Sequence, residues 1–576
     1  MSTDALNKQT YLVSGQQTEL IAASGEWHVD ALFNNQHGQP LRWISDPYLT
    51  EKYGVNSSTV ISYSFPGLVQ TSASYNYPDD VGEITSTPFT SQQVIDIRIA
   101  LKEVSKYINV TFVEVAETAD KVGTLRFGIN TITDESGNYI KGIAATATPP
   151  GTSPRGGDIF FNIQFLKTGN FAQGVSSPGE TGAGDVTVLY HEIFHALGLE
   201  HPNDNNNIVF QEDRNSREYS VMAGEYADEN QAHYLFNETD YKVASTPMVY
   251  DIAPLQHLYG VNTLHNAGDT IHTFDPETPF IHTLWDATGE DTLDFSNFSK
   301  NNIINLNGGT NSTIKGNSSW SSANILGLAY GIAIENANGG SGSDKLIGNS
   351  LGNVFKGNAG NDTIFGNAGD DTIFADGGSD SIDGGGGIDT IKYTLSQANY
   401  ILALGETNST IKEISTNTND SFSTIERIVF ADNAIALDID GANSAGGIYR
   451  TYKAAFNRTP DKGGFGYWID RADNGASAVQ MAEGFVWSGE FQTLYGVTTS
   501  DNYLVGNDVE AVVDLFYRNV LGRAPDQGGL DYYASTIVAQ DKTGGQVLAE
   551  IADSAENRTN LLSTLENGMN YDLWVA

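Results

Sequence analysis

The chain has no cysteine among its 576 residues. Disulfide bridges, zinc–thiolate sites and cysteine nucleophiles are therefore excluded, although this absence alone does not place the protein inside a cell. No apolar run approaches the roughly 20 residues of a membrane-spanning helix, so we expect no membrane span. The first residues, MSTDALNKQTYLVSGQQ, lack a basic segment and an apolar segment, and they are not typical of a secretory signal peptide.

Basic residues are scarce. The sequence has 30 lysines and arginines against 71 aspartates and glutamates, which gives a net charge of −41. This charge disfavours nucleic-acid backbones and anionic membranes as partners, and it favours bound cations that offset the repulsion. With 39% hydrophobic residues the chain is typical of a globular protein, and its length predicts three or four domains.

The segment up to about residue 260 mixes patterns of strands and helices. Alternating apolar residues predict a strand at 59–65, and further strands are expected at 109–115, 124–129 and 156–163. Apolar residues at helical spacing follow a cap at Thr90 and Ser91. A second helix is expected between Asp185 and Gly198.

The second helix carries the sequence HEIFHALGLEH, which holds three of the ten histidines. His191 and His195 are four residues apart and share one helix face, so both imidazoles can reach one metal ion. Glu192 points to another side and can accept a proton from a water molecule on the metal. Gly198 can adopt a positive φ and turn the chain so that His201 approaches the same ion.

Three neutral histidines with an open fourth position are the arrangement of a catalytic zinc site. Zinc would lower the pKa of a water molecule towards neutrality and supply a nucleophile. The alternative for the shorter HExxH motif is a helix with histidines on a polar face; the third histidine and the glycine favour zinc. Met222 lies about twenty residues after the third histidine, where metzincin proteases have their methionine turn.

Residues 339–392 form six units of nine residues that approximate Gly-Gly-x-Gly-x-Asp-x-U-x, with an apolar residue at every eighth position. Glycine-rich turns and aspartates predict calcium held between stacked turns of a parallel β-roll. The alternative is a flexible glycine-rich linker, which does not explain the regular apolar position. Asn353 replaces the aspartate of the second unit, so one site there is expected to be weak or missing. The candidate calcium ligands are Gly340, Gly342, Asp344, Gly360, Asp362, Gly369, Asp371, Gly378, Asp380, Gly387 and Asp389, with Asp269, Asp286 and Asp291 ahead of the repeats.

A second repeat appears in the C-terminal part, where helical patterns dominate. Residues 449–468 match residues 514–533 at an offset of 65, and both contain R-x-P-D-x-G-G. The arginine and aspartate of each copy can form a helix-capping pair. The alternative is a docking module that attaches the protein to a bacterial cell-surface layer or to a substrate.

Five segments in this order resemble the serralysin family of secreted bacterial metalloproteases: HEIFHALGLEHPND, REYSVM, DIAPLQHLYG, TLWDATGEDTLDFS and ENANGGSGSDKLIGN. The similarity covers roughly residues 27–437. It implies zinc-dependent hydrolysis of protein substrates, with His191, His195 and His201 as ligands and Glu192 as general base and acid. It also implies secretion by an ABC-type exporter that reads a C-terminal signal, for which MNYDLWVA is a candidate, although an ordinary fraying helix also fits this ending. The C-terminal repeats resemble a helical domain of unassigned function on secreted and surface proteins.

The sequence departs from the family in one respect. Most serralysins have a tyrosine two residues past the methionine that coordinates zinc and helps stabilise the oxyanion; here that position is Gly224, followed by Tyr226. Either Tyr226 takes that role or the site is three histidines and water, and we favour the second. Residues 156–163 are placed like the family's edge strand for substrate, and an ordinary core strand fits them equally well.

These patterns predict a multidomain protein: an α+β metzincin-like protease domain, a parallel β-roll of calcium-binding repeats and an all-α C-terminal domain. We expect a candidate pro-segment at 1–22, the protease at 23–262, the β-roll domain at 263–440 and the helical repeats with a candidate secretion signal at 441–576. The expected function is that of a secreted, extracellular zinc endopeptidase with structural calcium; attachment to a bacterial cell-surface layer through the helical repeats stays an open alternative. The alternative is a catalytically weak calcium-binding surface or adhesion protein.

Overall fold

The computed structural model describes most of the chain in segments. The described residues are 17–33, 40–45, 50–51, 58–66, 73–76, 83–117, 122–132, 143–151, 155–163, 166, 171, 186–202, 215–223, 234–235, 241–242, 244–317, 324–405, 407–496, 499–500, 503–504 and 509–574. They divide into two compact units, Met1–Gly342 and Ser343–Ala576. Within these described residues, no helix is both long and apolar enough to cross a membrane.

The first unit contains a five-stranded sheet in the order β6-β3-β7-β9-β8. Four of its strands are parallel, and β8 pairs with β9 in the antiparallel direction. The strands are β6 (Val110–Glu114), β3 (Thr59–Ser64), β7 (Leu125–Asn130), β9 (Asp158–Asn162) and β8 (Ala145–Ala147). The expected strands are thus present. Residues 158–162 form a buried interior strand, and among the described strands β6 and β8 lie at the two edges of the sheet.

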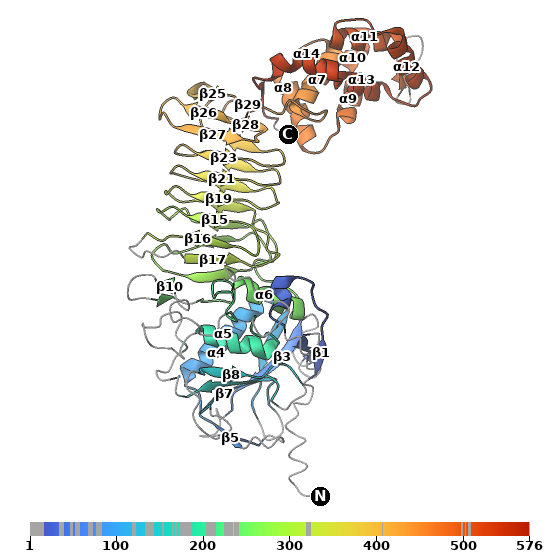
Figure 1. The fold of residues 1–576 in the computed structure, drawn as a ribbon. Helices are drawn as coiled ribbons and strands as arrows, with labels where there is room; N and C mark the ends of the chain where they lie inside the picture. Colours follow the sequence, from blue (N-terminus) through green and yellow to red (C-terminus); the bar gives the residue numbers. More distant parts are fainter. Residues whose placement is uncertain are drawn as a thin grey trace. The chain divides into compact units, whose positions relative to one another are not determined.

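Helices α4 (Ser91–Tyr107) and α5 (Val186–Leu197) pack side by side against this sheet (Figure 1). The α4 helix begins where expected, because Thr90 and Gln93 form a capping box that satisfies two free backbone N–H groups. Its face buries Val94, Ile97, Leu101 and Val104. Every residue of α5 except His191 and His195 is buried, so the helix is fixed in the core while these two histidines keep partial exposure.

Residues 17–33 belong to the body of the first unit. Strand β1 (Thr18–Leu20) pairs with β2 (Leu41–Trp43), and helix α2 (Trp27–Asp30) packs against α6 (Val249–Tyr259). The candidate pro-segment therefore includes a paired strand; its first 16 residues lie outside the described part of the chain.

The first unit also contains strands of the β-roll domain. Strands β12 (Ile271–Thr273), β14 (Thr292–Asp294) and β18 (Asn336–Asn338) are parallel neighbours. On the second sheet, β13 (Ile281–Leu284) runs parallel to β17 (Asn324–Leu328).

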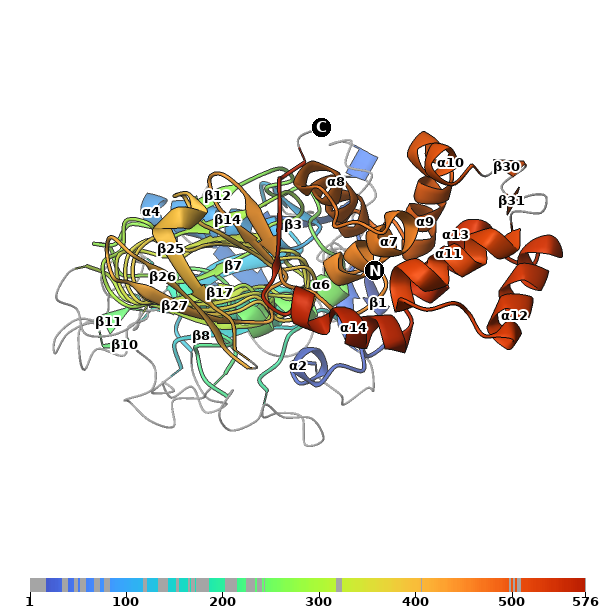
Figure 2. The same cartoon turned by 90° about the horizontal axis from the view of Figure 1, so that it is seen from above.

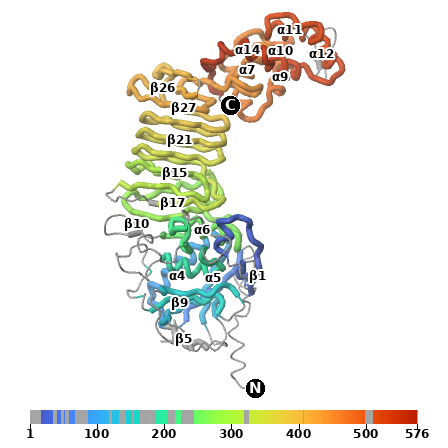
Figure 3. Tube along the Cα trace, in the orientation of Figure 1, coloured from blue at the N-terminus to red at the C-terminus, as the bar shows by residue number. Residues whose placement is uncertain are grey.

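In the second unit the nonapeptide repeats form the predicted parallel roll, with strands stacked one above another (Figure 3). Residues 18 apart are paired, so alternate units build two sheets. Each strand covers positions seven to nine of a unit: β19 (Lys345–Ile347), β20 (Val354–Lys356), β21 (Thr363–Phe365), β22 (Thr372–Phe374), β23 (Ser381–Asp383) and β24 (Thr390–Lys392). The eighth-position side chains are at most 2% exposed, which confirms that they fill the interior.

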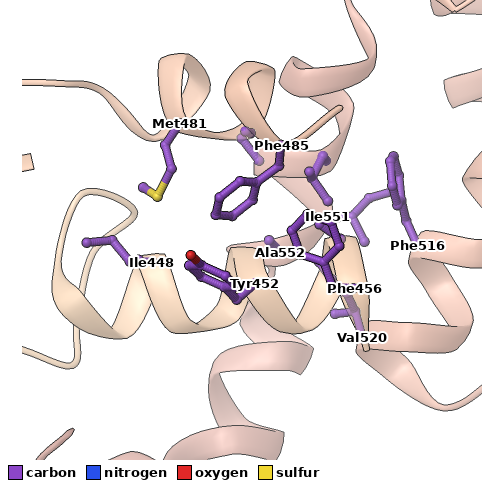
Figure 4. Packing of buried hydrophobic residues seen from close by; sticks show 14 of the residues in the cluster. Ile448, Tyr452, Phe456, Met481, Phe485, Phe516, Val520, Ile551 and Ala552 are labelled. Carbon is purple, nitrogen blue, oxygen red and sulfur yellow. The ribbon is translucent and has the colours of Figure 1, made fainter. Parts of the chain in front are cut away.

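The C-terminal repeats form a helical module with its own apolar core. In Figure 4, Tyr452 and Phe456 of α7 (Ala445–Phe456) face Phe485 of α9 (Ala478–Val486) and Phe516 of α11 (Val509–Leu521). The all-α prediction is confirmed for the body of the module. The chain then returns to the roll, because β32 (Met569–Tyr571) pairs with β29 (Ala434–Ala436).

Candidate metal centre

Helix α5 and the turn after it bring three imidazoles to one point. The Nε2 atoms of His191, His195 and His201 lie 3.1, 3.1 and 3.2 Å from one another. An ion bound at about 2.0–2.1 Å in tetrahedral geometry would hold its nitrogen ligands roughly 3.3 Å apart. The spacing therefore fits a single zinc ion, and these histidines form the metal-binding cluster found among the described residues.

Two backbone carbonyls fix the orientation of the rings. The Nδ1 of His191 donates to the carbonyl of Val221 at 2.9 Å, and the Nδ1 of His195 donates to the carbonyl of Leu199 at 2.7 Å. Because a carbonyl only accepts, each Nδ1 carries the proton and each Nε2 directs its lone pair inward. Burial and the two neighbouring imidazoles lower the pKa of His191, which keeps it neutral and ready to bind a cation.

Gly198 makes the third ligand possible. Its φ is +112°, and a Cβ there would lie 2.5 Å from the carbonyl oxygen of Leu41. The helix ends at this residue, and the following N–H of Glu200 donates to the carbonyl of Leu32 at 2.9 Å. The conformation that favours glycine and the anchor from the N-terminal segment together direct His201 towards the other rings.

The turn that contains Met222 is hydrogen-bonded to a buried carboxylate. Asp251 of α6 accepts from the Ser220 hydroxyl at 2.6 Å, the Val221 N–H at 3.0 Å and the Met248 N–H at 2.9 Å. Met222 itself is fully buried. Burial raises the pKa of Asp251 to about 6, and these donors act in the opposite direction. The sequence does not single out Asp251, because its partners in the methionine turn, Ser220 and Val221, lie about thirty residues away.

Glu192 follows the first histidine on α5 and is 6% exposed. Burial raises the pKa of its carboxyl to about 8 when no cation is near. A carboxyl with a pKa near neutrality is suited to accept and return a proton. Gly224 and Tyr226, and Asp185 at the expected helix start, lie outside the described residues.

The repeat aspartates form two columns along the roll. Each backbone N–H donates to the carboxylate 18 residues later: Asp344 to Asp362, Asp362 to Asp380, and Asp371 to Asp389, at 2.7–2.9 Å. The second oxygens of Asp362, Asp371 and Asp389 are buried without a hydrogen-bond partner. Buried carboxylate oxygens without donors are the arrangement that a hard cation would satisfy.

The columns extend beyond the repeats that the sequence shows. Asp420 accepts from the Asp380 N–H at 3.0 Å, and Glu426 accepts from the Asp389 N–H at 2.9 Å. The repeat period ends at residue 392, so the sequence gives no signal for either residue. Glycines at the first position of a unit also matter, because a Cβ at Gly357 or Gly366 would lie 2.2 or 2.1 Å from the second oxygen of that unit's aspartate.

The glycines named as candidate calcium ligands fall into two groups. Gly360, Gly369, Gly378 and Gly387 have φ values of 109° to 144°, which favour glycine. In the first unit, Gly340 and Gly342 lie against the backbone of residues 298–301, where a Cβ would come within 2.1 and 2.4 Å of backbone atoms.

Of the three acidic residues ahead of the repeats, two have oxygens without partners. Asp291 is fully buried; its Oδ1 accepts from the Thr270 N–H at 2.8 Å, and its Oδ2 has no partner. Asp286 accepts from His272 at 2.9 Å through Oδ2, and its Oδ1 is similarly unpaired. Asp269 is exposed and accepts from the Glu290 N–H at 3.0 Å.

Asn353 differs from the aspartates it replaces. Its side chain exchanges hydrogen bonds with Asn349, accepting from the backbone N–H at 2.9 Å and donating to the side-chain oxygen at 3.1 Å. The amide thus uses internal partners where a carboxylate would offer charge to a cation.

The R-x-P-D-x-G-G motifs build the same structure twice. Asp461 caps α8 (Lys462–Asp473) through the Gly464 N–H, and Asp526 caps α12 (Gln527–Val538) through the Gly529 N–H, both at 2.8 Å. Each arginine lies over a tyrosine ring and pairs with a glutamate of a later helix, Glu490 or Glu556. The motif residues therefore have structural partners, in agreement with the capping interpretation.

Comparison with protein families matches three parts of the chain. Residues 82–236 match the Matrixin family, and residues 251–440 match the family described as Peptidase M10 serralysin C terminal. Residues 442–495 and 498–561 match a domain of unknown function, DUF4214.

Curated relatives are similar over about half of the chain. Metallopeptidase AprA of Pseudomonas marginalis is 34% identical over 326 residues, which cover 52% of this chain and 62% of that protein. Serralysin A of Dickeya chrysanthemi is 33% identical over 46% of this chain and 55% of its own length. Serralysin of Proteus mirabilis is 30% identical over 53% of this chain and 62% of its own length. The chain thus spans less than two thirds of the length of these relatives.

Proposed function

The chain belongs to the serralysin family of metallopeptidases, and from this premise we propose that it is a zinc-dependent endopeptidase that hydrolyses protein substrates. The observation that carries the proposal is the convergence of the Nε2 atoms of His191, His195 and His201, which lie within 3.2 Å of one another. Catalytic zinc is what the family implies, and the donor set fits it.

His191, His195 and His201 would hold the ion. When bound, zinc lowers the pKa of a water molecule and polarises the carbonyl of the scissile peptide. Glu192 would take a proton from that water on its carboxylate and deliver it to the leaving amine. The buried position of Glu192 supports this role, because burial already favours the protonated carboxyl that the second step requires.

The edge of the sheet formed by β8 is the proposed position of the substrate. Strand β8 packs against α5, the helix of the histidines, and its outer side is not paired with a described strand. An extended peptide could add to this edge through main-chain hydrogen bonds, which give affinity with little demand on side chains. The proposed contact strand for protein substrates is therefore Ala145–Ala147.

We further propose that calcium stabilises the roll outside the cell. The unpaired oxygens of Asp362, Asp371 and Asp389 support this, as do their raised pKa values, because burial and neighbouring carboxylates disfavour a metal-free charged state. Extracellular calcium modules bind at about 10⁻⁴–10⁻³ M, so the roll would fold after export. Export by an ABC-type exporter, and attachment to a cell surface through the helical module, remain part of this proposal.

Hydrolysis of casein by the wild-type protein and by Glu192→Ala tests the peptidase proposal. Zinc content must be measured on both samples, because the substitution leaves the three histidines in place. We expect one zinc per chain in both and activity only in the wild type. Equal, negligible rates in both would favour the alternative of a catalytically weak calcium-binding protein. His195→Ala is the matched control that should lose zinc and activity together.

A further inference from the structure

The helical module is inserted between two neighbouring strands of one sheet. The chain leaves the roll after β29 and returns as β32, which pairs antiparallel with β29 through Ala434–Tyr571, Ile435–Asn570 and Ala436–Met569. Strand β32 packs against α8, and in Figure 2 the red segment that contains it runs past α8. The side chains of Met569 and Tyr571 are 5% and 4% exposed and belong to the core of the helical module.

Helix α8 of the first repeat holds this strand closely. A Cβ on Gly466 would lie 1.8 Å from the carbonyl oxygen of Asp572, so only glycine allows the approach. The Asp572 N–H donates to the carbonyl of Lys462 at 3.2 Å. The ring of Trp574 meets Tyr467 edge-on at 4.9 Å between centroids, which adds an aromatic contact beyond the strand.

The same helix is also tied to the roll. Arg427 of β28 (Arg427–Val429) is 3% exposed and donates to both carboxylate oxygens of Asp473, at 2.6 and 3.1 Å. It also pairs with Asp438. A buried arginine with two carboxylate partners fixes the end of α8 against the roll, because loss of either partner would leave charge buried.

The two repeats differ at the residues that make these contacts. The structural residues of the motif are shared, but Gly466 corresponds to Asp531 and Asp473 corresponds to Val538. Asp531 would collide with a strand placed as β32 is. On the second repeat, Val538 is 71% exposed and Tyr532, the counterpart of Tyr467, is 53% exposed.

We propose that the first helical repeat is a docking site for the chain's own C-terminal strand, β32. The role of this site is to hold β32 against β29, the neighbouring strand of the roll. The ligand is residues 569–574, an extended segment that offers buried side chains on one face, a backbone carbonyl to Gly466 and an indole to Tyr467. The second repeat has the same motif structure and differs at the residues that form this site. This assigns a binding function to one copy of the domain of unknown function, and it does not depend on peptidase activity.

Thiol labelling tests the docking site directly, because the chain has no cysteine of its own. In a Met569→Cys background, alkylation reports how often the strand leaves its site. Gly466→Ala should raise the rate by at least about tenfold, since the new methyl group collides with the Asp572 carbonyl. Gly463→Ala is the matched control on the same helix, where a Cβ meets nothing closer than 3.9 Å, and its rate should stay within about twofold.

A second pair of variants compares equivalent positions of the two repeats, and each variant truncates a tyrosine side chain. Tyr467→Ala should increase labelling, and Tyr532→Ala at the equivalent position should not. Circular dichroism confirms that the helices remain folded, and casein hydrolysis should be unchanged in all four variants. Equal labelling in both members of both pairs would overturn the docking site, whereas lost casein hydrolysis in the parent protein would bear only on the proposed peptidase.

Discussion

Asp251 accepts the backbone N–H of Val221 at 3.0 Å, and the carbonyl of the same Val221 accepts from Nδ1 of His191 at 2.9 Å. A buried carboxylate on α6 is therefore linked to a zinc-ligand candidate on α5 through one residue of the methionine turn. Partners of this kind fix the tautomer and direction of a ligand.

Replacing Asp251 with asparagine should weaken zinc binding. The amide places an N–H group against backbone donors, so we expect the free energy of unfolding to fall by about 2–4 kcal/mol and zinc affinity to fall about 10–100-fold. Urea unfolding and competition with a zinc chelator measure the two effects. Asp440→Asn, at an exposed aspartate, is the control. Unchanged zinc affinity in a folded Asp251→Asn protein would refute the link.

Gly198→Ala should displace His201. The substitution combines a φ of +112° with a Cβ 2.5 Å from the Leu41 carbonyl, and we expect a loss of about 1–3 kcal/mol in stability together with weaker zinc binding. Gly475→Ala separates the two causes, because Gly475 has a φ of +90° and open space around its Cβ. If both variants bind zinc equally well, the close approach to Leu41 does not position the third ligand.

The degenerate repeat should be repairable. Asn353→Asp restores a carboxylate to its column, so we expect tighter or additional calcium binding, while Asp371→Asn should remove a site that has an unpaired buried oxygen. Calorimetric titration of calcium into metal-free protein compares the numbers of bound ions. The opposite order, with more calcium on Asp371→Asn than on Asn353→Asp, would contradict the assignment of the columns.

The calcium-free roll should gain stability on acidification. Burial raises the pKa of Asp362, Asp371 and Asp380 to about 7, above the value near 3.9 in an unfolded chain. Groups with raised folded pKa values stabilise the fold at low pH, and that contribution is lost as pH rises through about 7.

Unfolding by urea in excess EGTA at pH 8 and pH 5.5 measures this effect, with a higher midpoint expected at pH 5.5. The triple variant Asp362→Asn, Asp371→Asn and Asp380→Asn should lose most of the difference. A wild-type midpoint that is lower at pH 5.5 than at pH 8 would show that these carboxylates are not strained by burial.

The sequence predicts those parts of the site that depend on local spacing. His191, His195, Gly198 and His201 lie within eleven residues, so helix geometry and one turn suffice to bring the rings together. The repeats are predicted equally well, because a period of nine fixes which residue is buried.

Long-range pairing explains what the sequence leaves open. The role of Asp251 becomes visible only when the fold brings α6 into contact with the methionine turn. Asp420 belongs to a column of carboxylates only through a hydrogen bond with Asp380, 40 residues away. The order of the described strands decides that β8, and not β9, lies at an edge of the sheet. Likewise, β32 returns to the roll after 132 intervening residues, which no local pattern specifies.

Zinc K-edge X-ray absorption on protein loaded with one equivalent of zinc tests the central claim most directly. The account predicts three imidazole nitrogens at about 2.0–2.1 Å and an oxygen in the remaining position. His201→Ala should reduce the number of imidazole ligands to two. A spectrum without imidazole scattering, or one unchanged by His201→Ala, would contradict the metal centre on which the proposed function rests.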